Sequence, residues 1–187
     1  LPLQSGCDNI LDKMNRGYTK NDYLSKVYKL KRLYPDMGIT TDIIVGFPGE
    51  TDADFLETLH VIKEIEFDNM FSFKYSQRME TLAASFDGQI SNSIKEARLI
   101  MLQDIQKEIT LRKNKQMVGK VRDVLIEGRS KNKAGKNGSS QFSGRTTCNK
   151  IVNLMTNNEN IGKILPIRII NAFHNSLLGE EMINICY

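Results

Sequence analysis

The sequence predicts an α/β region of three parallel βα units followed by a small antiparallel, OB-like β-barrel. Up to about residue 115, β-branched apolar runs alternate with segments whose apolar residues recur at helical spacing, which is typical of parallel strands joined by helices. Beyond that point, short apolar runs are separated by glycine-rich turns, which favours a small barrel. Charge divides unevenly as well, because residues 1–86 hold 10 basic and 13 acidic residues, whereas residues 87–187 hold 16 and 9. We therefore expect two domains, residues 1–115 and 116–187.

The first predicted unit is a short strand, Leu1–Ser5, followed by two helices. Asp8 is expected to cap the first of these helices. Thr19 starts the second, because Asp22 stands three positions later and completes a capping box with aspartate in place of glutamate. Pro35 ends that helix, since proline lacks the amide hydrogen that a helix interior requires.

The second unit is centred on the apolar, β-branched run Ile39–Val45, which predicts a buried strand. The turn Gly46–Gly49 ends the strand, and Glu50–Asp52 provides a helix start with acidic residues in its first turn. Asp42 is the one charged residue within the run, so its carboxylate needs a buried donor or a ligand. Ligands bind at the carboxyl ends of parallel strands, so this turn is an expected site, although an ordinary βα turn explains the same residues.

The third unit pairs a strand over Met70–Ser76 with a helix from about Ser91 to Lys113. Three parallel strands are too few to close a (β/α) barrel, which normally needs about 250 residues. We therefore expect half of a barrel, with an exposed strand edge and inner face, that is either partly disordered or covered by a partner copy. The alternative is a small sandwich complete in itself. The predicted buried stripe of the last helix consists of Ile94, Ala97, Met101, Ile105 and Ile109.

In the second region, four short apolar runs predict strands, and the polar segment SKNKAGKNGSSQFSG, residues 130–144, predicts a surface loop. Residues 112–150 contain 11 lysines and arginines but only two acidic residues. Such a surface attracts polyanions through counterion release, although a solvated basic surface is the other explanation. The predicted strands are Val121–Ile126, Lys150–Met155, Ile164–Phe173 and Met182–Cys186.

Five segments, in order along the chain, resemble the radical S-adenosylmethionine (SAM) tRNA methylthiotransferases. LPLQSGCDNILDKMNRGYT, DIIVGFPGET and FDNMFSFKYS are similar to the fourth, fifth and sixth strand motifs of that family's barrel. LIEGRSK and GRTTCNKIVN are similar to its C-terminal TRAM domain, a small RNA-binding β-barrel. The resemblance implies the second half of a radical SAM (β/α) barrel followed by a TRAM domain, with the N-terminal region of the same protein missing from this sequence.

The resemblance implies S-adenosyl-L-methionine and [4Fe–4S] clusters as cofactors of the whole enzyme. SAM would lie across the carboxyl ends of the strands, where Gln4 and Ser5 are suited to hydrogen-bond its ribose or methionyl group. Arg16 would present a guanidinium fork to the methionyl carboxylate. Asp42 and Phe47 would border the adenine or ribose. Each of these residues also has an ordinary structural explanation, as a polar loop residue, a surface arginine or a core side chain.

The resemblance assigns RNA contacts to the TRAM region, at Arg129, Arg145, Asn149 and Lys150. Arginine binds phosphate bidentately and stacks on bases, and the single-stranded loop of a tRNA anticodon stem-loop offers both groups. Phe142 lies among basic residues and is expected to stack on a base.

The three cysteines, Cys7, Cys148 and Cys186, are too far apart in sequence for a metal-binding motif. The chain lacks the C-x-x-x-C-x-x-C triad of the radical SAM enzymes, so no metal ligand and no catalytic residue is assigned to it. Separated cysteines in odd number, with no long apolar run, favour a cytoplasmic protein without a membrane span. The loop YSQRMETLAA departs from the family's YSPRPGTPAA, so no catalytic role is assigned to it either.

The resemblance implies methylthiolation at C2 of N(6)-isopentenyladenosine next to the anticodon, by an enzyme of which this chain would be an inactive fragment. One alternative is a sibling methylthiotransferase that acts on threonylcarbamoyl-adenosine or on a ribosomal protein. The other is a non-catalytic RNA-binding protein whose α/β region is only a scaffold. A cysteine triad upstream in the gene would separate the enzymes from the scaffold.

Overall fold

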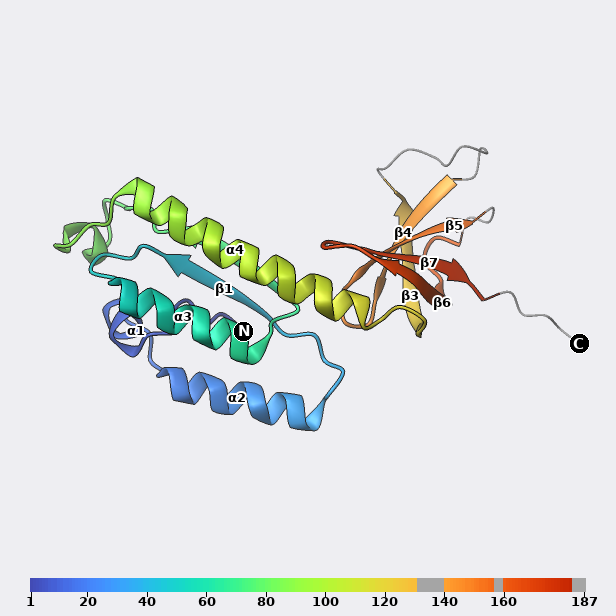
Figure 1. Ribbon diagram of the computed structural model, residues 1–187, viewed down its shortest axis with the longest axis horizontal. Coiled ribbons are helices and arrows are strands. Elements are labelled where there is room, and N and C mark those ends of the chain that lie inside the picture. The colour runs from blue at the N-terminus through green and yellow to red at the C-terminus, as the bar shows by residue number, and fades with distance from the viewer. Residues whose placement is uncertain (131–139, 157–159, 183–187) are drawn as a thin grey trace, which may run out of the picture. The chain divides into compact units, whose positions relative to one another are not determined.

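The computed structural model describes residues 1–130, 140–156 and 160–182. The chain divides into two compact units, Leu1–Ile109 and Thr110–Tyr187. The first unit consists of helices and a small parallel sheet, and the second is a closed β-barrel (Figure 1). Within the described residues, no helix has both the length and the apolar character that crossing a membrane requires.

The sheet of the first unit pairs two parallel strands, β1 (Thr40–Val45) and β2 (Asn69–Lys74). The predicted first strand is reduced to a single parallel bridge between Gln4 and Ile43. The Gln4 amide donates to the Asp42 carbonyl at 2.8 Å, and the Ile44 amide donates to the Gln4 carbonyl at 3.0 Å. The expectation of three full parallel strands is therefore corrected to two strands and one bridging residue, because the backbone of Gln4 turns into the left-handed region and ends the pairing.

Helices α1 (Asp8–Lys13), α2 (Lys20–Leu33) and α3 (Asp52–Ile65) follow the predicted order. The predicted capping box of Thr19 and Asp22 is confirmed, and α3 carries a second one, in which Thr51 is the N-cap residue. The prediction that Asp8 caps α1 is wrong, because Cys7 occupies the N-cap position. Asp8 instead accepts a hydrogen bond from the Lys20 amide at 2.6 Å, which joins α1 to the start of α2.

The last helix of the first unit, α4 (Asn92–Lys115), buries a different face from the one predicted. Ile94 and Met101 are exposed, and of the predicted stripe only Ile109 is buried. Figure 1 shows α4 and α3 running alongside β1. Hydrogen-bond partners explain the choice of face, because three polar side chains of α4 reach backbone carbonyls or a carboxylate of neighbouring elements. The residues buried along α4 are Lys95, Arg98, Leu102, Gln106 and Ile109.

The two faces of the sheet differ in what covers them. Ile43 and Val45 are fully buried in a core shared with α2, α3 and α4. Phe71 and Phe73 lie on the other face, paired with Asp42 and Ile44, and their side chains are 57% and 54% exposed. Exposed aromatic side chains on a strand usually mark a surface that another element covers.

Five strands close the barrel of the second unit in the order β3-β4-β5-β7-β6. The strands are antiparallel except for β5 and β7, which pair in parallel, so the prediction of a wholly antiparallel barrel is corrected at this one pair. Val124, Ile126, Val152, Leu154 and Ile167 are among the side chains that fill the interior. The strands are β3 (Val121–Arg129), β4 (Ser140–Thr146), β5 (Ile151–Thr156), β6 (Ile164–Ala172) and β7 (Leu177–Glu181).

Two of these strands were not predicted. β4 begins at Ser140, inside the segment that was expected to be a loop, and residues 131–139 of that segment lie outside the described residues. β7 (Leu177–Glu181) lies between the predicted strands Ile164–Phe173 and Met182–Cys186, where no strand was expected. The strand predicted over Met182–Cys186 also lies outside the described residues, except for Met182, which is not in a strand.

Candidate functional site

A cavity of about 1020 Å³ opens at the carboxyl ends of β1 and β2 in the first unit. Its walls come from the end of α1, from the two strand ends and from the segment that follows β2. That segment contains the short 3-10 helix η1 (Leu82–Ser85). The lining residues are Asp12, Lys13, Met14, Asn15, Arg16, Ile44, Phe47, Phe73, Lys74, Tyr75, Ser76, Arg78, Thr81, Leu82, Ala83 and Phe86.

Arg16, one of the predicted cofactor-binding residues, lines this cavity and is joined to another of them, Gln4, which is not itself a lining residue. The Arg16 Nη2 atom donates to the Gln4 Oε1 atom at 3.2 Å. Gln4 is buried and has a φ of 68°, a left-handed conformation that is strained for a residue with a side chain. Its two backbone hydrogen bonds to β1 hold it in that conformation. The guanidinium of Arg16 is thereby oriented, and its further N–H groups can bind an anion.

An aromatic group forms another part of the cavity wall. Phe47, also predicted to bind the cofactor, packs edge-on against Tyr75 at 5.0 Å and against Phe86 at 6.3 Å between ring centroids. The Tyr75 hydroxyl is shielded from solvent and has no hydrogen-bond partner within the described residues. Buried hydroxyl groups are nearly always paired, so this group favours a ligand that brings a polar atom to an otherwise aromatic surface.

The turn between β1 and α3 is built so that its backbone lies beside α4. Gly46 has a φ of 72°, and a Cβ atom there would lie 2.3 Å from the Cγ atom of Lys95. The buried Glu50 carboxylate accepts hydrogen bonds from the Gly46 amide and from Arg98, both at 2.7 Å. Burial raises the pKa of Glu50, and the hydrogen bond from Gly46 and the charge of Arg98 oppose this only in part. The turn that shapes the cavity is therefore held by a charged group in the protein interior.

Ser5 and Asp42 do not line the cavity, and their assignment to the cofactor stays a prediction. The Ser5 hydroxyl accepts from the Cys7 amide at 3.2 Å and lies 3.4 Å from the Thr58 hydroxyl of α3. It therefore serves the packing of α1 on α3. Asp42 is half-buried in the middle of β1, on the open face of the sheet.

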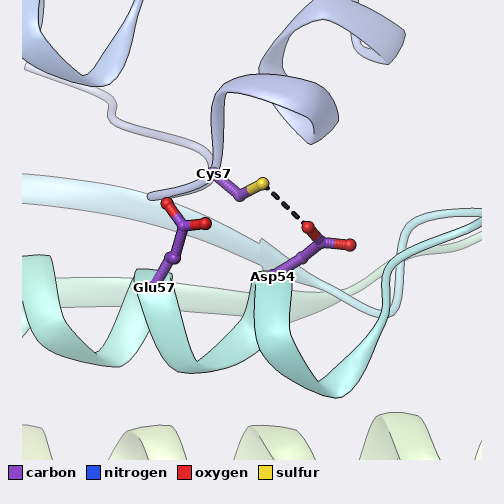
Figure 2. A group of neighbouring side chains, drawn as sticks. All are labelled: Cys7, Asp54 and Glu57. Carbon is purple, nitrogen blue, oxygen red and sulfur yellow. Dashed lines mark hydrogen bonds between the residues drawn. The ribbon is translucent and has the colours of Figure 1, made fainter.

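Cys7, Asp54 and Glu57 form a group in which one ligand atom from each side chain lies within 4.8 Å of the others. Figure 2 shows the Cys7 thiol donating to the Asp54 carboxylate, at 2.9 Å. Burial and the Asp54 hydrogen bond raise the pKa of the Cys7 thiol. Burial also acts to raise the pKa of Asp54, but hydrogen bonds from Cys7 and Thr51 outweigh it and lower that pKa. Glu57 is paired with Lys20 at 2.6 Å, so each member of the group has a structural partner.

Sequence reasoning assigned no catalytic role to the segment after β2, although it supplies seven of the lining residues. Its departure from the family pattern was the reason for leaving it out. The available signal was its position, because a segment that follows a parallel strand lies at the edge of the sheet where ligands bind. Lys95 and Arg98 were missed as well, since polar residues in a helix are ordinarily assigned to its solvent face.

In the second unit, the turn between β4 and β5 brings three of the predicted RNA-binding residues together. The Arg145 Nε atom donates to the Glu127 carboxylate at 3.1 Å, and its Nη1 atom donates to the Asn149 Oδ1 atom at 2.9 Å. Asn149 has a φ of 63°, and the Lys150 amide donates to the Thr146 hydroxyl at 3.0 Å. Arg129 lies at the far end of β3, on its exposed face. These four assignments stay predictions of RNA contact.

Arg145 also stands in an exposed row that crosses four strands. Leu125 of β3 pairs with Arg145 on one side and with Ile164 of β6 on the other, and Arg145 pairs with Ile151 of β5. Residues directly opposite in a sheet point to the same face, and the three apolar members are exposed. The proposed stacking of Phe142 on a base is wrong, because its side chain is 1% exposed and lies in the barrel core.

Comparison with known proteins finds a family match within each unit. The radical SAM superfamily matches residues 1–62, and the TRAM domain matches residues 115–181. The chain is 51% identical, over 97% of its length, to a tRNA-2-methylthio-N(6)-dimethylallyladenosine synthase of Syntrophus aciditrophicus. Proteins of the same description from Syntrophobacter fumaroxidans and Clostridium botulinum are 47% and 46% identical over 96% and 97% of the chain. The chain spans 38%, 38% and 39% of the length of these three relatives. It therefore carries radical SAM sequence followed by a TRAM domain.

Proposed function

We propose that this chain is part of a radical SAM tRNA methylthiotransferase that modifies N(6)-isopentenyladenosine next to the anticodon. The similarity to three synthases of that description supports the proposal over almost the whole chain. The structural observation that carries it is the paired Gln4 and Arg16 at a cavity where two parallel strands end. A TRAM domain in the same chain adds a surface for RNA. The enzyme acts in the cytoplasm on this proposal, because its substrate is tRNA.

The first unit is the second half of a (β/α) barrel on this proposal. The open face of the sheet, with Phe71, Phe73 and Ile44, then lines the barrel interior once the remaining strands are in place. The remaining strands would come from the N-terminal region of the same protein. This assignment accounts for aromatic side chains that otherwise stand exposed on a strand.

The residues of the cavity fit S-adenosylmethionine. Arg16, oriented by Gln4, would bind the carboxylate of its methionyl group, and Phe47 and Tyr75 would contact the adenine ring. The Tyr75 hydroxyl would find in the adenine edge or the ribose the partner that it lacks within the described residues. When bound, SAM would supply the radical chemistry that activates C2 of the target adenosine for sulfur insertion. The contribution of this chain is to bind and orient the two reacting molecules.

The two cysteines within the described residues do not fit a [4Fe–4S] cluster. Cys7 is buried and hydrogen-bonded to Asp54, and Cys148 belongs to the turn of the barrel. Cluster ligands would therefore have to come from outside this sequence.

The TRAM barrel would bind the anticodon stem-loop through the β4–β5 turn. Arg145 is fixed by Glu127 and Asn149 and is flanked by exposed Leu125 and Ile151, so it can meet phosphate while the apolar neighbours contact a base. Lys150 would add a second cation for the RNA backbone.

The test uses the intact protein in a bacterial strain that lacks its own enzyme. Mass spectrometry of the tRNA nucleosides should show the methylthio derivative of N(6)-isopentenyladenosine. Arg16→Ala should remove it and weaken binding of S-adenosylhomocysteine in equilibrium dialysis, whereas Arg32→Ala on the exposed face of α2 should do neither. A methylthio derivative of threonylcarbamoyl-adenosine alone would assign the protein to the sibling enzymes. If no modified nucleoside forms while RNA binding is undiminished, the result would favour the non-catalytic RNA-binding protein.

A further inference from the structure

The loop that follows β2 presents two apolar side chains to solvent beside the cavity. Met79 is 98% exposed and Leu82 is 82% exposed, the highest values for large apolar side chains among the described residues. Leu82 lines the cavity, and Arg78 and Thr81 of the same loop line it as well. An apolar tip at the mouth of a binding cavity points to a contact surface rather than to packing within this chain.

Hydrogen bonds within the loop hold it in a defined turn. The Thr81 amide and hydroxyl both donate to the Arg78 carbonyl, at 3.0 and 2.8 Å. The Gln77 side chain donates to the Ala84 carbonyl at 2.7 Å and so closes the base of the loop. Since these bonds hold the tip in place before any ligand arrives, a contact made by Met79 loses less conformational entropy on binding.

The charges around the cavity favour an anionic partner. Four cations line it, whereas Asp12 is the only acidic residue among the lining residues. Lys74 is paired with Glu96, but the exposed Arg78 has no ion pair within the described residues. Apolar side chains next to cations suit single-stranded RNA, whose bases stack on apolar groups while phosphates bind arginine.

We propose that the loop Gln77–Phe86 is a second RNA contact, located on the first unit, that separates the target nucleotide from its stacked neighbour. Met79 and Leu82 would pack against the exposed base, and Arg78 would bind the flanking phosphate. Enzymes that act on a base must take it out of the stack, and apolar wedges achieve this in other nucleic-acid complexes. The inference rests on the proposed function. It concerns the positions at which this chain departs from the family pattern.

The test measures base unstacking separately from affinity, with an anticodon stem-loop that carries 2-aminopurine beside the target adenosine. The emission of 2-aminopurine rises when the base leaves the stack. With the intact protein, the wild type should raise the emission. Met79→Ser combined with Leu82→Ser should at least halve that rise and change Kd by no more than about threefold. Arg78→Ala should weaken binding by about threefold to tenfold and lower the salt slope by about one.

The matched control is Leu33→Ser, because Leu33 is a 56% exposed leucine that does not line the cavity. It should leave both readings unchanged, and circular dichroism should show that every variant is folded. Loop variants that match the wild type in emission and in Kd would overturn the inference. If the same stem-loop still loses affinity in Arg145→Ala, the proposed function stands without it. A wild-type protein that fails to bind the stem-loop would instead overturn the proposed function.

Discussion

The ion pair between Arg98 and Glu50 holds the turn that shapes the cavity, and its loss should be costly. The side chains of Arg98 and Glu50 are only 8% and 1% exposed, and Arg98 also bonds Asp52 at 2.7 Å. Replacing Arg98 by methionine leaves a carboxylate in the interior without its cation. Breaking one side of a buried pair costs about 3–5 kcal/mol. The exposed pair of Lys107 and Asp104 on the same helix provides the control, since losing it costs about 0.5 kcal/mol or less.

The same variant should change the dependence of stability on pH. Because the pKa of Glu50 is raised above 4.5 in the folded chain, the folded state binds the proton of the Glu50 carboxyl group more tightly than the unfolded state does. Its contribution to the free energy of unfolding is therefore fully present below pH 4.5 and is lost as pH rises through the folded value. Arg98→Met removes a charge that favours the carboxylate, so this loss should become larger.

Urea unfolding at two pH values measures both effects. Five of the six tyrosines lie in the first unit and the chain has no tryptophan, so tyrosine fluorescence reports on that unit. Arg98→Met should be destabilised more at pH 7 than at pH 5, and adding Glu50→Gln should recover more than half of the loss, because glutamine still accepts from the Gly46 amide. Equal stabilities of Arg98→Met and Lys107→Met at pH 7 would refute this account.

Four further predictions follow from individual contacts. The chain alone should hold no iron after anaerobic reconstitution. The brown absorbance of an iron–sulfur cluster, together with stoichiometric iron and sulfide, would contradict this prediction. Arg145→Ala should weaken binding of an anticodon stem-loop by about 1–3 kcal/mol if Arg145 contacts a base, and Arg129→Ala should weaken it by less if Arg129 contacts only phosphate. Fluorescence polarisation at two salt concentrations distinguishes a base contact from a phosphate contact. Gly144→Ala should destabilise the barrel in thermal unfolding, since its Cβ atom would lie 2.3 Å from the Leu125 carbonyl oxygen. Tyr75→Phe should leave the urea midpoint unchanged or raised, because its hydroxyl has no partner within the described residues, but should weaken S-adenosylhomocysteine binding to the intact protein.

The sequence by itself determined the features that depend on neighbours along the chain. Thr19 and Asp22 form their capping box because the two residues lie within one helical turn. The run Ile39–Val45 gave a strand, and Pro35 ended the helix before it, for equally local reasons. The order of helices and strands in the first unit could therefore be predicted.

Other features depended on partners that are distant in the sequence. The buried face of α4 was mispredicted because Lys95 and Arg98 find partners on Tyr75 and Glu50, and a pattern of apolar residues carries no record of those partners. β4 contains few apolar residues, yet it pairs on both sides because the barrel closes around it. Phe142 is buried by the same closure.

The candidate site divides in the same way. Arg16 and Phe47 could be assigned to a binding region by their motifs, but only the tertiary structure joined Arg16 to Gln4 through a hydrogen bond. The hydrogen bonds of Ser5 to its neighbours, the unpaired hydroxyl of Tyr75 and the exposed tip at Met79 likewise appear only in three dimensions. Local sequence sets the helix caps and strand starts, whereas burial and hydrogen-bond satisfaction are properties of the assembled fold.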